Sequence, residues 1–258
     1  MFLKVPIDIL PPENFSQVID SLLPSAEDTG NPSQANGRDI VLLSLSDLLR
    51  ARRKGEYRNY VQNAALVIPI SKSIVSGVRF LTKKKIFRYM PFNFVINLLS
   101  VLEKNEQSLY LLGGKSNILS KAERNIRSTF PHIGIVGRHD AAIKKREEPG
   151  ITEAIRKASP ALLLAGKGIR GKELWIPRNS SRISPGFRLW CSDLFEVFAK
   201  KKRHPSNAVF ERGLESLVFF LQNPLRFFRI LPYFRYKALL LIYKIFKIQH
   251  SGAGKQAR

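Results

Sequence analysis

Short apolar runs alternate with longer helix-like segments through most of this chain. Five runs have the composition of short buried strands, at residues 66–70, 109–112, 133–136, 161–165 and 187–191. Helical character is found at residues 94–104, 116–129, 150–158 and 207–222. Strands that alternate with helices of about 10 to 15 residues form βαβ units with parallel strands. The pattern therefore predicts the α/β class, with a Rossmann-like, mostly parallel sheet flanked by helices.

The chain is strongly basic and also rich in apolar residues. Its 258 residues include 43 Lys and Arg against 20 Asp and Glu, a formal net charge of +23, and 44% are hydrophobic. Disordered basic proteins combine high charge with low hydrophobicity, so this composition excludes that class. A folded domain with a basic surface attracts anions, which leaves nucleic acid, a phosphate-bearing ligand or an acidic membrane as partners.

Cysteine usage and hydropathy exclude several kinds of site and location. A single cysteine, Cys191, rules out a disulfide framework, and with four scattered histidines it gives no metal-ligand cluster. We therefore expect no metal and no other cofactor. Asp8 interrupts the apolar run of a signal peptide, and the longest uncharged stretch, residues 89–102, is shorter than a membrane span. These features predict a cytoplasmic protein.

Charge and turn residues divide the chain into three predicted parts. Residues 1–40 form an N-terminal extension with a turn-rich, apolar-poor linker at residues 24–37. Residues 41–205 hold the alternating strands and helices. Residues 206–258 form a basic C-terminal helical appendage, in which no acidic residue follows Glu215. The appendage is therefore the part of the chain with the strongest attraction for anions.

Three glycine turns follow three of the predicted strands. They read LLGGKSN at 111–117, IVGRHDAA at 135–142 and AGKGIRGKELW at 165–175. Ligands of parallel sheets bind beyond the carboxyl ends of the strands, where glycine lets the backbone approach a phosphate and lysine adds positive charge. Glycine after a strand is more often a simple turn, but three such turns make a diphosphate site an equal alternative. None matches the dinucleotide fingerprint or the Walker A spacing.

Six segments occur in an order that is more specific than any one of them. They are EYRNYVQNAALVIP (56–69), LYLLGGKSNI (109–118), FPHIGIVGRHD (130–140), SPALLLAGKG with KELWI (159–176), KRHP (202–205) and GLESLVFFLQNPLRFFR (213–229). In this order they resemble the WecG/TagA/CpsF family of glycosyltransferases, whose members transfer an N-acetylmannosamine-type sugar from a UDP donor to a polyprenyl-diphosphate-linked acceptor. The resemblance implies a UDP-sugar and that acceptor as partners, in cell-envelope polysaccharide synthesis.

The chain departs from this family where the chemistry is expected. Family members follow the strand proline with Asp-Gly, and that aspartate is regarded as the general base, whereas here Pro69 is followed by Ile70 and Ser71. A hydrocarbon side chain cannot accept a proton, so whether the chain is an enzyme stays open. The other family positions that differ fall on Leu42, Ser44, Pro91, Asn93, Lys172, Ser216 and Phe219.

Sugar transfer with inversion requires a carboxylate near the acceptor hydroxyl and positive charge or amide donors near the leaving UDP. The catalytic residues are unknown, and two weak candidates remain on the glycine turns, Asp140 and Glu173. Asp140 falls where the family also has an acidic residue, which favours donor binding over the role of the base. For Glu173 the favoured alternative is a carboxylate that is stabilised at a helix N-terminus. The residues expected to bind the donor are Gly113, Gly114, Lys115, Gly137, Asp140, Gly166 and Lys172.

The C-terminal sequence YFRYKALLLIYKIFKI, at 233–248, predicts a basic amphipathic helix. Its lysines lie on one side, opposite Leu239, Leu241, Ile242 and Phe246. This is typical of a helix in the headgroup plane of a membrane, and the alternative is a core helix whose lysines face water. Family members use a C-terminal appendage to reach their acceptor, so we expect peripheral binding to the anionic inner face of the cell membrane. The residues expected to contact acceptor or membrane are Arg203, Arg226, Arg229, Arg235, Lys237, Lys244 and Lys247.

Three functions remain open at the level of sequence. The first is an active glycosyltransferase with a rewritten site. The second is a non-catalytic relative that serves as a membrane-associated partner of an active enzyme. The third, a nucleic-acid-binding protein that uses basic clusters at 83–85, 144–146 and 200–203, is the least favoured because no recognised RNA or DNA module is visible. The oligomeric state is also open, and a homo-oligomer is one option.

Overall fold

The computed structural model describes residues 1–23, 38–183, 186–203, 210–211 and 231–246. Within these residues it contains one sheet of six strands in the order β2-β1-β6-β5-β3-β4, and every pair is parallel. The predicted α/β class with a parallel sheet and flanking helices is therefore confirmed. The strands are β1 (Asp39–Leu43), β2 (Leu66–Pro69), β3 (Ser108–Leu112), β4 (Gly134–His139), β5 (Leu162–Ala165) and β6 (Phe187–Trp190).

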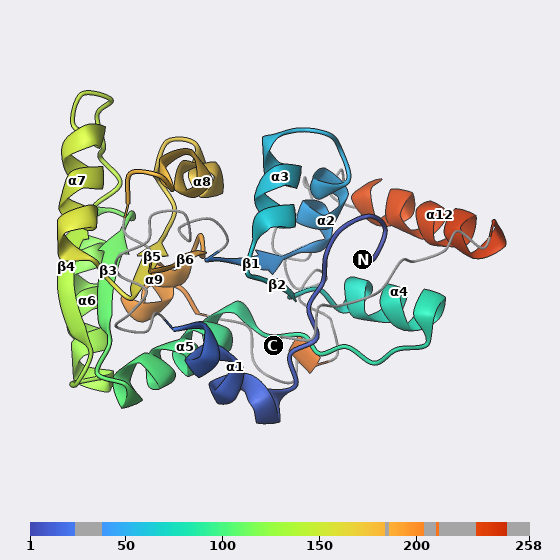
Figure 1. The fold of residues 1–258 in the computed structure, drawn as a ribbon, viewed down its shortest axis with the longest axis horizontal. Helices are drawn as coiled ribbons and strands as arrows, with labels where there is room; N and C mark the ends of the chain where they lie inside the picture. Colours follow the sequence, from blue (N-terminus) through green and yellow to red (C-terminus); the bar gives the residue numbers. More distant parts are fainter. Residues whose placement is uncertain (24–37, 184–185, 204–209, 212–230, 247–258) are drawn as a thin grey trace.

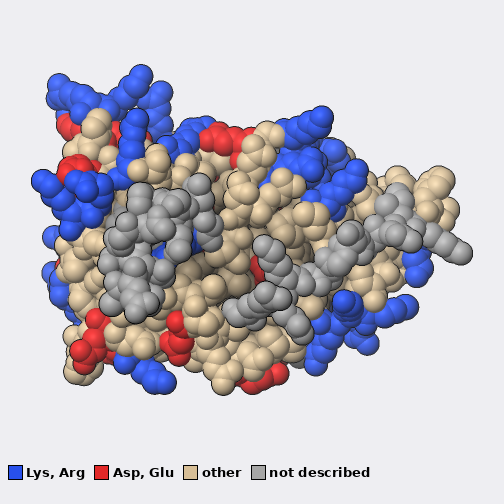
Figure 2. Space-filling model, viewed as in Figure 1, with Lys and Arg blue, Asp and Glu red and all other residues tan. Residues whose placement is uncertain are grey.

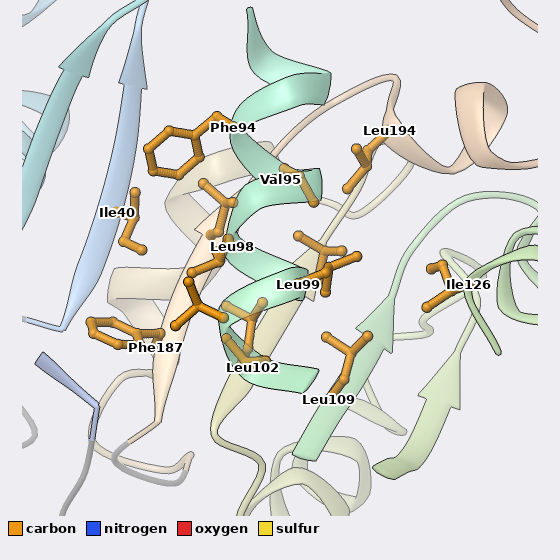
Figure 3. Packing of buried hydrophobic residues seen from close by; sticks show 14 of the residues in the cluster. Ile40, Phe94, Val95, Leu98, Leu99, Leu102, Leu109, Ile126, Phe187 and Leu194 are labelled. Carbon is orange, nitrogen blue, oxygen red and sulfur yellow. The ribbon is translucent and has the colours of Figure 1, made fainter. Parts of the chain in front are cut away.

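Four helices cover one face of the sheet: α1 (Phe15–Leu22), α5 (Pro91–Lys104), α6 (Ser116–Thr129) and α9 (Leu194–Phe198). Figure 3 shows α5 in the middle of this layer, where Leu98, Leu99 and Leu102 pack toward Phe187 and Leu109 of the strands. Each fully buried Leu or Phe stabilises the fold by about 1.5–3 kcal/mol. Because all five side chains are almost fully buried, they hold α5 firmly on the sheet.

The opposite face carries two separate apolar clusters. One joins β1 and β2 to α2 (Leu45–Ala51), α3 (Glu56–Asn63), α4 (Lys72–Thr82) and α12 (Leu231–Ile245). The other joins β3 and β5 to α7 (Glu148–Ala158) and α8 (Trp175–Asn179). Asp39 of β1 and Arg188 of the neighbouring strand β6 form a buried ion pair with an N–O distance of 2.7 Å. Short 3-10 helices precede α1, at η1 (Pro12–Asn14), and α8, at η4 (Lys172–Leu174).

The N-terminal residues pack on the same domain as the sheet. Phe2, Leu3 and Val5 are buried among the helices of the first cluster. The Asp8 amide donates to the carbonyl oxygen of Val67 at 3.0 Å, and the Asp8 carboxylate accepts from the Val67 amide at 2.7 Å. β2 is an outer strand, so its free edge would otherwise expose unpaired amide and carbonyl groups. The two bonds from Asp8 satisfy the amide and the carbonyl group of Val67 on this edge. The division expected at residue 40 falls inside β1, and the linker at 24–37 lies outside the described residues.

Helix α12 docks through three side chains, Tyr236, Leu240 and Tyr243, which are buried against α2 and α4. The predicted helix at 233–248 is thus present over Leu231–Ile245 and ends within the described residues. Of the apolar residues expected on one side, Leu241, Ile242 and Phe246 are exposed and Leu239 is half-buried, so they do not form the docked side, and their contact with a membrane stays a prediction. Of the predicted helix at 207–222, only residues 210–211 lie within the described residues. Among the described helices, none is long and apolar enough to cross a bilayer.

Candidate active site

The glycine turns after β3, β4 and β5 meet at the carboxyl edge of the sheet. The amide of Gly113 donates to the His139 carbonyl at 2.8 Å, and the amide of Gly114 donates to the Lys167 carbonyl at 2.7 Å. The amide of Gly166 in turn donates to the Leu112 carbonyl at 2.8 Å. Parallel strands end at the same edge, so turns far apart in sequence become neighbours here.

Glycine is required where the turns after β3 and β5 touch. Gly113 has a φ of 111°, and a Cβ atom there would lie 2.7 Å from the carbonyl oxygen of Gly166. A Cβ atom on Gly166 would lie 2.6 Å from the ring of Phe195 in α9. The glycines therefore serve close packing, and their amide hydrogens are used inside the protein. Contact of these glycines with a donor stays a prediction. Because their amides already donate within the protein, such contact would be a close approach of the donor to the backbone.

A small open pocket of about 230 Å³ lies beside these turns. It is lined by Ser116 and Leu119 of α6 and by Arg138, His139 and Asp140 at the end of β4. The positive end of the α6 dipole and the Arg138 guanidinium suit an anionic group. Arg138 also pairs with Glu123 of α6, and the Asp140 carboxylate accepts from the Ala142 amide at 2.9 Å. Of the residues predicted to bind the donor, Asp140 lines this pocket, and Lys115 directly precedes Ser116.

The other side of the carboxyl edge holds Ile70 and Ser44. Leu43 of β1 pairs with Pro69 of β2, and the Ile70 amide donates to the Leu43 carbonyl at 3.1 Å. The two residues that follow, Ser44 and Ile70, are therefore neighbours. In the sheet order β2 and β4 are the two outer strands, so about five strand spacings of ~4.8 Å, roughly 24 Å, separate Ile70 from Asp140. Asp140 is too far away to replace a carboxylate at Ile70.

Ser44 and Asp47 form a capping box at the start of α2. The Ser44 hydroxyl donates to the Asp47 carboxylate at 2.5 Å, which also accepts from the Ser44 amide at 3.3 Å. In return the Asp47 amide donates to the Ser44 hydroxyl oxygen at 3.3 Å. Burial raises the pKa of Asp47 above its ordinary value, and nearby Glu173 adds to this against the opposing hydrogen bonds from Ser44.

Glu173 reaches the same region from η4, after β5. It forms an ion pair with Arg50 of α2, whose guanidinium lies 4.1 Å from the centre of the Tyr57 ring. Burial, with Asp47 and Glu173 nearby, raises the pKa of Tyr57. The two catalytic candidates from the sequence are thus placed apart, with Asp140 at the β4 edge and Glu173 near β1.

Comparison with known proteins identifies the family of this chain. Residues 1–250 match the model of the glycosyl transferase WecG/TagA/CpsF family. The chain belongs to this family. The N-acetylglucosaminyldiphosphoundecaprenol N-acetyl-beta-D-mannosaminyltransferase of Bacillus subtilis (strain 168) is 20% identical over 186 residues, which is 72% of each chain. A protein of the same name from Staphylococcus aureus (strain NCTC 8325 / PS 47) is 21% identical over 150 residues, 58% of each chain.

The resemblance that the sequence motifs indicated between residues 56 and 236 is therefore confirmed. In this WecG/TagA/CpsF family member, the departing positions Leu42, Ser44 and Ile70 lie together at the ends of β1 and β2. The glycine turns that keep the family pattern lie on the β3, β4 and β5 side. Lys172, which also departs from the family pattern, lies in η4 after β5, so rewritten positions are found on both parts of the edge.

Helix α9 holds the turn after β5 by ion pairs. Lys167 lies 3.2 Å from Asp193 and 2.9 Å from Glu196, and Lys202 lies 2.5 Å from Asp193. Lys167 is therefore neutralised within the protein. Of the residues expected to contact acceptor or membrane, Arg235, Lys237 and Lys244 are exposed on α12, and Arg203 is exposed at the end of a described segment. Arg226, Arg229 and Lys247 lie outside the described residues.

Two features of the carboxyl edge were not identified from the sequence. The first is the Ser44–Asp47 pair, for which the pattern Ser-Leu-Ser-Asp, a hydroxyl residue with an acid three positions later, is a usable signal. The second is contact from the C-terminal region, where Arg88 stacks on the Phe210 ring at 3.8 Å. Across the described residues, His, Cys, Asp and Glu side chains form no group of three or more that could hold a metal.

Proposed function

We propose that this protein transfers an N-acetylhexosamine from a UDP-sugar to a polyprenyl-diphosphate-linked acceptor in cell-envelope polysaccharide synthesis. The observation that carries the proposal is the family match over residues 1–250. The named relatives from B. subtilis and S. aureus are N-acetylmannosaminyltransferases that act on N-acetylglucosaminyldiphosphoundecaprenol. The comparisons do not favour the non-catalytic relative or the nucleic-acid-binding protein that the sequence left open.

The donor diphosphate is proposed to bind at the pocket beside the α6 N-terminus. Arg138 supplies a cation there, and Lys115 a second one at the helix start. A Cβ atom on Gly137 would lie 2.4 Å from the Tyr110 ring, so this glycine serves packing, and its contact with the donor is proposed to come through the backbone. Lys172 comes from the turn after β5 and would approach from the side of β1. Positive charge at these positions stabilises the negative charge that develops on the leaving UDP.

The acceptor is proposed to reach the site from an anionic membrane surface on the cytoplasmic side. Six apolar side chains of α12 face away from the protein within about 140° of one another at about 100° per residue. They are Leu231, Phe234, Leu241, Ile242, Ile245 and Phe246, with exposed fractions from 44% to 71%. Lys237 and Lys244 border this stripe on one side, and Arg235 lies within it. Apolar side chains bordered by cations suit insertion among anionic headgroups.

The surface around α12 adds further positive charge. Figure 2 shows Lys and Arg side chains above and below the end of the molecule where α12 lies. Lys83, Lys84 and Lys85, which follow α4 directly, are three exposed basic residues in succession. Each basic residue near an anionic membrane contributes about 1 kcal/mol to binding. The oligomeric state is untested, and a homo-oligomer stays a prediction.

Binding of the donor tests this function first. Isothermal calorimetry with UDP and UDP-N-acetylhexosamines should give saturable binding, and Arg138→Gln should weaken it about tenfold because a charge-assisted hydrogen bond contributes about 1.5–3 kcal/mol. Arg156→Gln is the matched control, since Arg156 is an exposed arginine that pairs with Glu153 on α7. Wild-type protein that binds no UDP compound would contradict the proposal.

A further inference from the structure

An acceptor that carries a diphosphate needs a cationic site of its own, apart from the one that holds the donor. In the proposed transfer, one sugar ring separates the acceptor hydroxyl from the acceptor's diphosphate. That diphosphate therefore lies near the donor pocket but outside it. Exposed Lys and Arg side chains beside the pocket are the groups that can bind it, because they form charge-assisted hydrogen bonds with phosphate oxygens.

Two segments that are far apart in the sequence are strongly basic. They are residues 50–58, at the end of α2 and the start of α3, and residues 170–182, in η4, α8 and their flanks. Together they contain nine basic residues and two acidic ones. Figure 2 shows part of this charge as a group of Lys and Arg side chains over the region where Figure 1 places α2 and α3. Such an excess of positive charge attracts anions.

Two ion pairs join the segments into one basic surface. Arg50 of α2 pairs with Glu173 of η4. The Arg178 guanidinium of α8 donates to the two carboxylate oxygens of Glu56 in α3, at 2.6 and 2.7 Å. These pairs use both acids of the two segments. The charge of the other basic residues is therefore not balanced within the surface.

Three cations of this surface meet at the turn around Gly171. Arg170 and Lys172 are its neighbours in sequence, and both are exposed. Neither forms an ion pair with another described residue. A Cβ atom on Gly171 would lie 3.0 Å from Nη1 of Arg178, so that guanidinium also lies against the turn. Because Glu56 takes Nε and Nη2 of Arg178, Nη1 is left on the side of the turn.

The same connection touches the wall of the donor pocket. Gly168 has a φ of 99°, and a Cβ atom there would lie 2.5 Å from the Cβ atom of Ala141. Ala141 directly follows Asp140, which lines the pocket. Two residues span at most about 7 Å, so the Cα atom of Arg170 lies within that distance of the Cα atom of Gly168. Arg170 and its neighbour Arg178 are therefore close to the donor pocket without lining it.

The far end of the basic surface adjoins the helix proposed to meet the membrane. The Arg52 guanidinium lies 5.8 Å from the centre of the Tyr243 ring of α12, and α12 packs on α2. The surface thus extends from α12 to the turn beside the donor pocket. A diphosphate that is anchored in the membrane by a polyprenyl chain would move along this surface toward the donor. This placement favours the lipid-linked acceptor over nucleic acid as the anion that binds here.

We propose that Arg170 and Arg178 bind the diphosphate of the polyprenyl-linked acceptor. The two guanidinium groups hold the acceptor from the η4 side, while Arg138 holds the donor diphosphate in its pocket. The acceptor hydroxyl then meets the donor sugar between these two sites. This inference rests on the proposed function and adds a binding site for its second substrate.

The test measures the affinity for both substrates in the double variant Arg170→Gln/Arg178→Gln. We expect the KM for a short polyprenyl-diphosphate-linked N-acetylglucosamine to rise at least about tenfold, because charge-assisted hydrogen bonds are lost. The Kd for UDP, measured by calorimetry, should stay within about twofold of the wild-type value, because these arginines do not hold the donor. Arg156→Gln is the matched control, since Arg156 is an exposed helix arginine that also pairs with a glutamate. It should change neither value.

Two single variants separate the effect of charge from that of structure. Glu56→Gln breaks the ion pair of Arg178 but keeps the guanidinium, so the KM for the acceptor should stay within about twofold of wild type or fall. Arg170→Lys keeps a positive charge and should raise this KM less than Arg170→Gln does. An equal rise in Glu56→Gln and Arg178→Gln would show that the ion pair matters and the free charge does not, which would overturn the role of Arg178.

A short polyprenyl diphosphate without a sugar tests the site in the absence of turnover. Wild-type protein should bind this probe more tightly than the matching polyprenyl monophosphate, because the second phosphate adds charge for the two arginines. The double variant should lose most of this preference. Equal preference for the diphosphate in both proteins would contradict the proposal.

The outcomes distinguish this inference from the proposed function. If wild-type protein transfers a sugar and the folded double variant keeps its acceptor KM within about twofold, the role of the two arginines is overturned and the function stands. An equal loss of affinity for UDP would assign the arginines to the donor and would also overturn the inference. Wild-type protein that neither binds a UDP-sugar nor transfers a sugar would overturn the proposed function, and this inference with it.

Discussion

Tyr236 of α12 occupies the space that a side chain on Gly77 of α4 would need. A Cβ atom at Gly77 would lie 1.8 Å from the Tyr236 hydroxyl oxygen, which donates to the Ser73 carbonyl at 2.8 Å. Gly77 thus lets two helices that are far apart in the sequence approach closely. Because α4 begins two residues after Ile70, this contact ties the C-terminal helix to the carboxyl edge of the sheet.

Substitution Gly77→Ala should loosen α12. Overpacking at a close contact costs about 1–3 kcal/mol, and here the Tyr236 ring must move to relieve it. We expect faster hydrogen exchange in α12 and faster proteolysis at its ends, with the sheet unchanged. Gly150→Ala is the matched control, since a Cβ atom there meets nothing within 4 Å, so the helix α7 should be unaffected or slightly stabilised. Equal exchange of α12 in both variants would contradict the contact.

The apolar stripe of α12 should drive membrane binding. Replacing Ile245 and Phe246, each 71% exposed, by serine should reduce sedimentation with anionic liposomes at least tenfold, because each inserted side chain contributes about 1.5–3 kcal/mol. Val136→Ser removes an exposed apolar side chain from β4 and should have no effect. Sedimentation that is unaltered by the double substitution would rule out membrane binding through this stripe.

The lysines of α12 should make this binding depend on salt. Lys237→Gln combined with Lys244→Gln should weaken binding to anionic liposomes by about 1 kcal/mol per residue and flatten its dependence on ionic strength. Neutral liposomes should show little difference between this variant and wild type. An identical salt dependence for both proteins would mean that these two charges do not face the membrane.

The buried ion pair between Asp39 and Arg188 should be essential for folding. Asp39→Asn leaves a neutral amide against a buried guanidinium charge, and loss of one partner of a buried pair costs about 3–5 kcal/mol. Denaturant unfolding should show this loss. Glu56→Gln, which removes one partner of an exposed pair, should cost under about 1 kcal/mol. Similar midpoints for the two variants would contradict the difference in burial.

A carboxylate placed at Ile70 should raise the activity, because Ile70 stands where the family pattern has its aspartate. We expect kcat of Ile70→Asp to exceed that of wild type at least about tenfold, as a general base contributes about 10²–10⁴-fold. Ile70→Asn has nearly the same shape without the charge and should give no increase. Equal rates for the two variants would exclude a gain from a base at this strand end.

Much of the sheet could be predicted from local sequence, because buried parallel strands are short runs of apolar residues. β1 was missing from the strands predicted by pattern, and only the family resemblance pointed to it, at Leu42 and Ser44. Its apolar residues run directly into the apolar positions of α2, so periodicity alone does not separate strand from helix. The meeting of the glycine turns followed from the rule that parallel strands share one carboxyl edge.

The distance between candidate site residues could not be predicted from the sequence. Asp140 and Glu173 both follow strands, but only the strand order places one at the outer strand β4 and the other near β1. Likewise, α12 has apolar residues on two faces. The face that docks is the one with Tyr236, which packs against Gly77 and its neighbours. Long-range packing decides both features, and local pattern carries little information about it.

We expect this family member to transfer a sugar. Purified protein should be mixed with UDP-N-acetylhexosamines and a short polyprenyl-diphosphate-linked N-acetylglucosamine acceptor, and the acceptor should be followed by mass spectrometry. We predict a product that is heavier by one N-acetylhexosamine, with an equal amount of UDP released. An unchanged acceptor and no UDP release, from folded protein in the presence of anionic liposomes, would contradict the account.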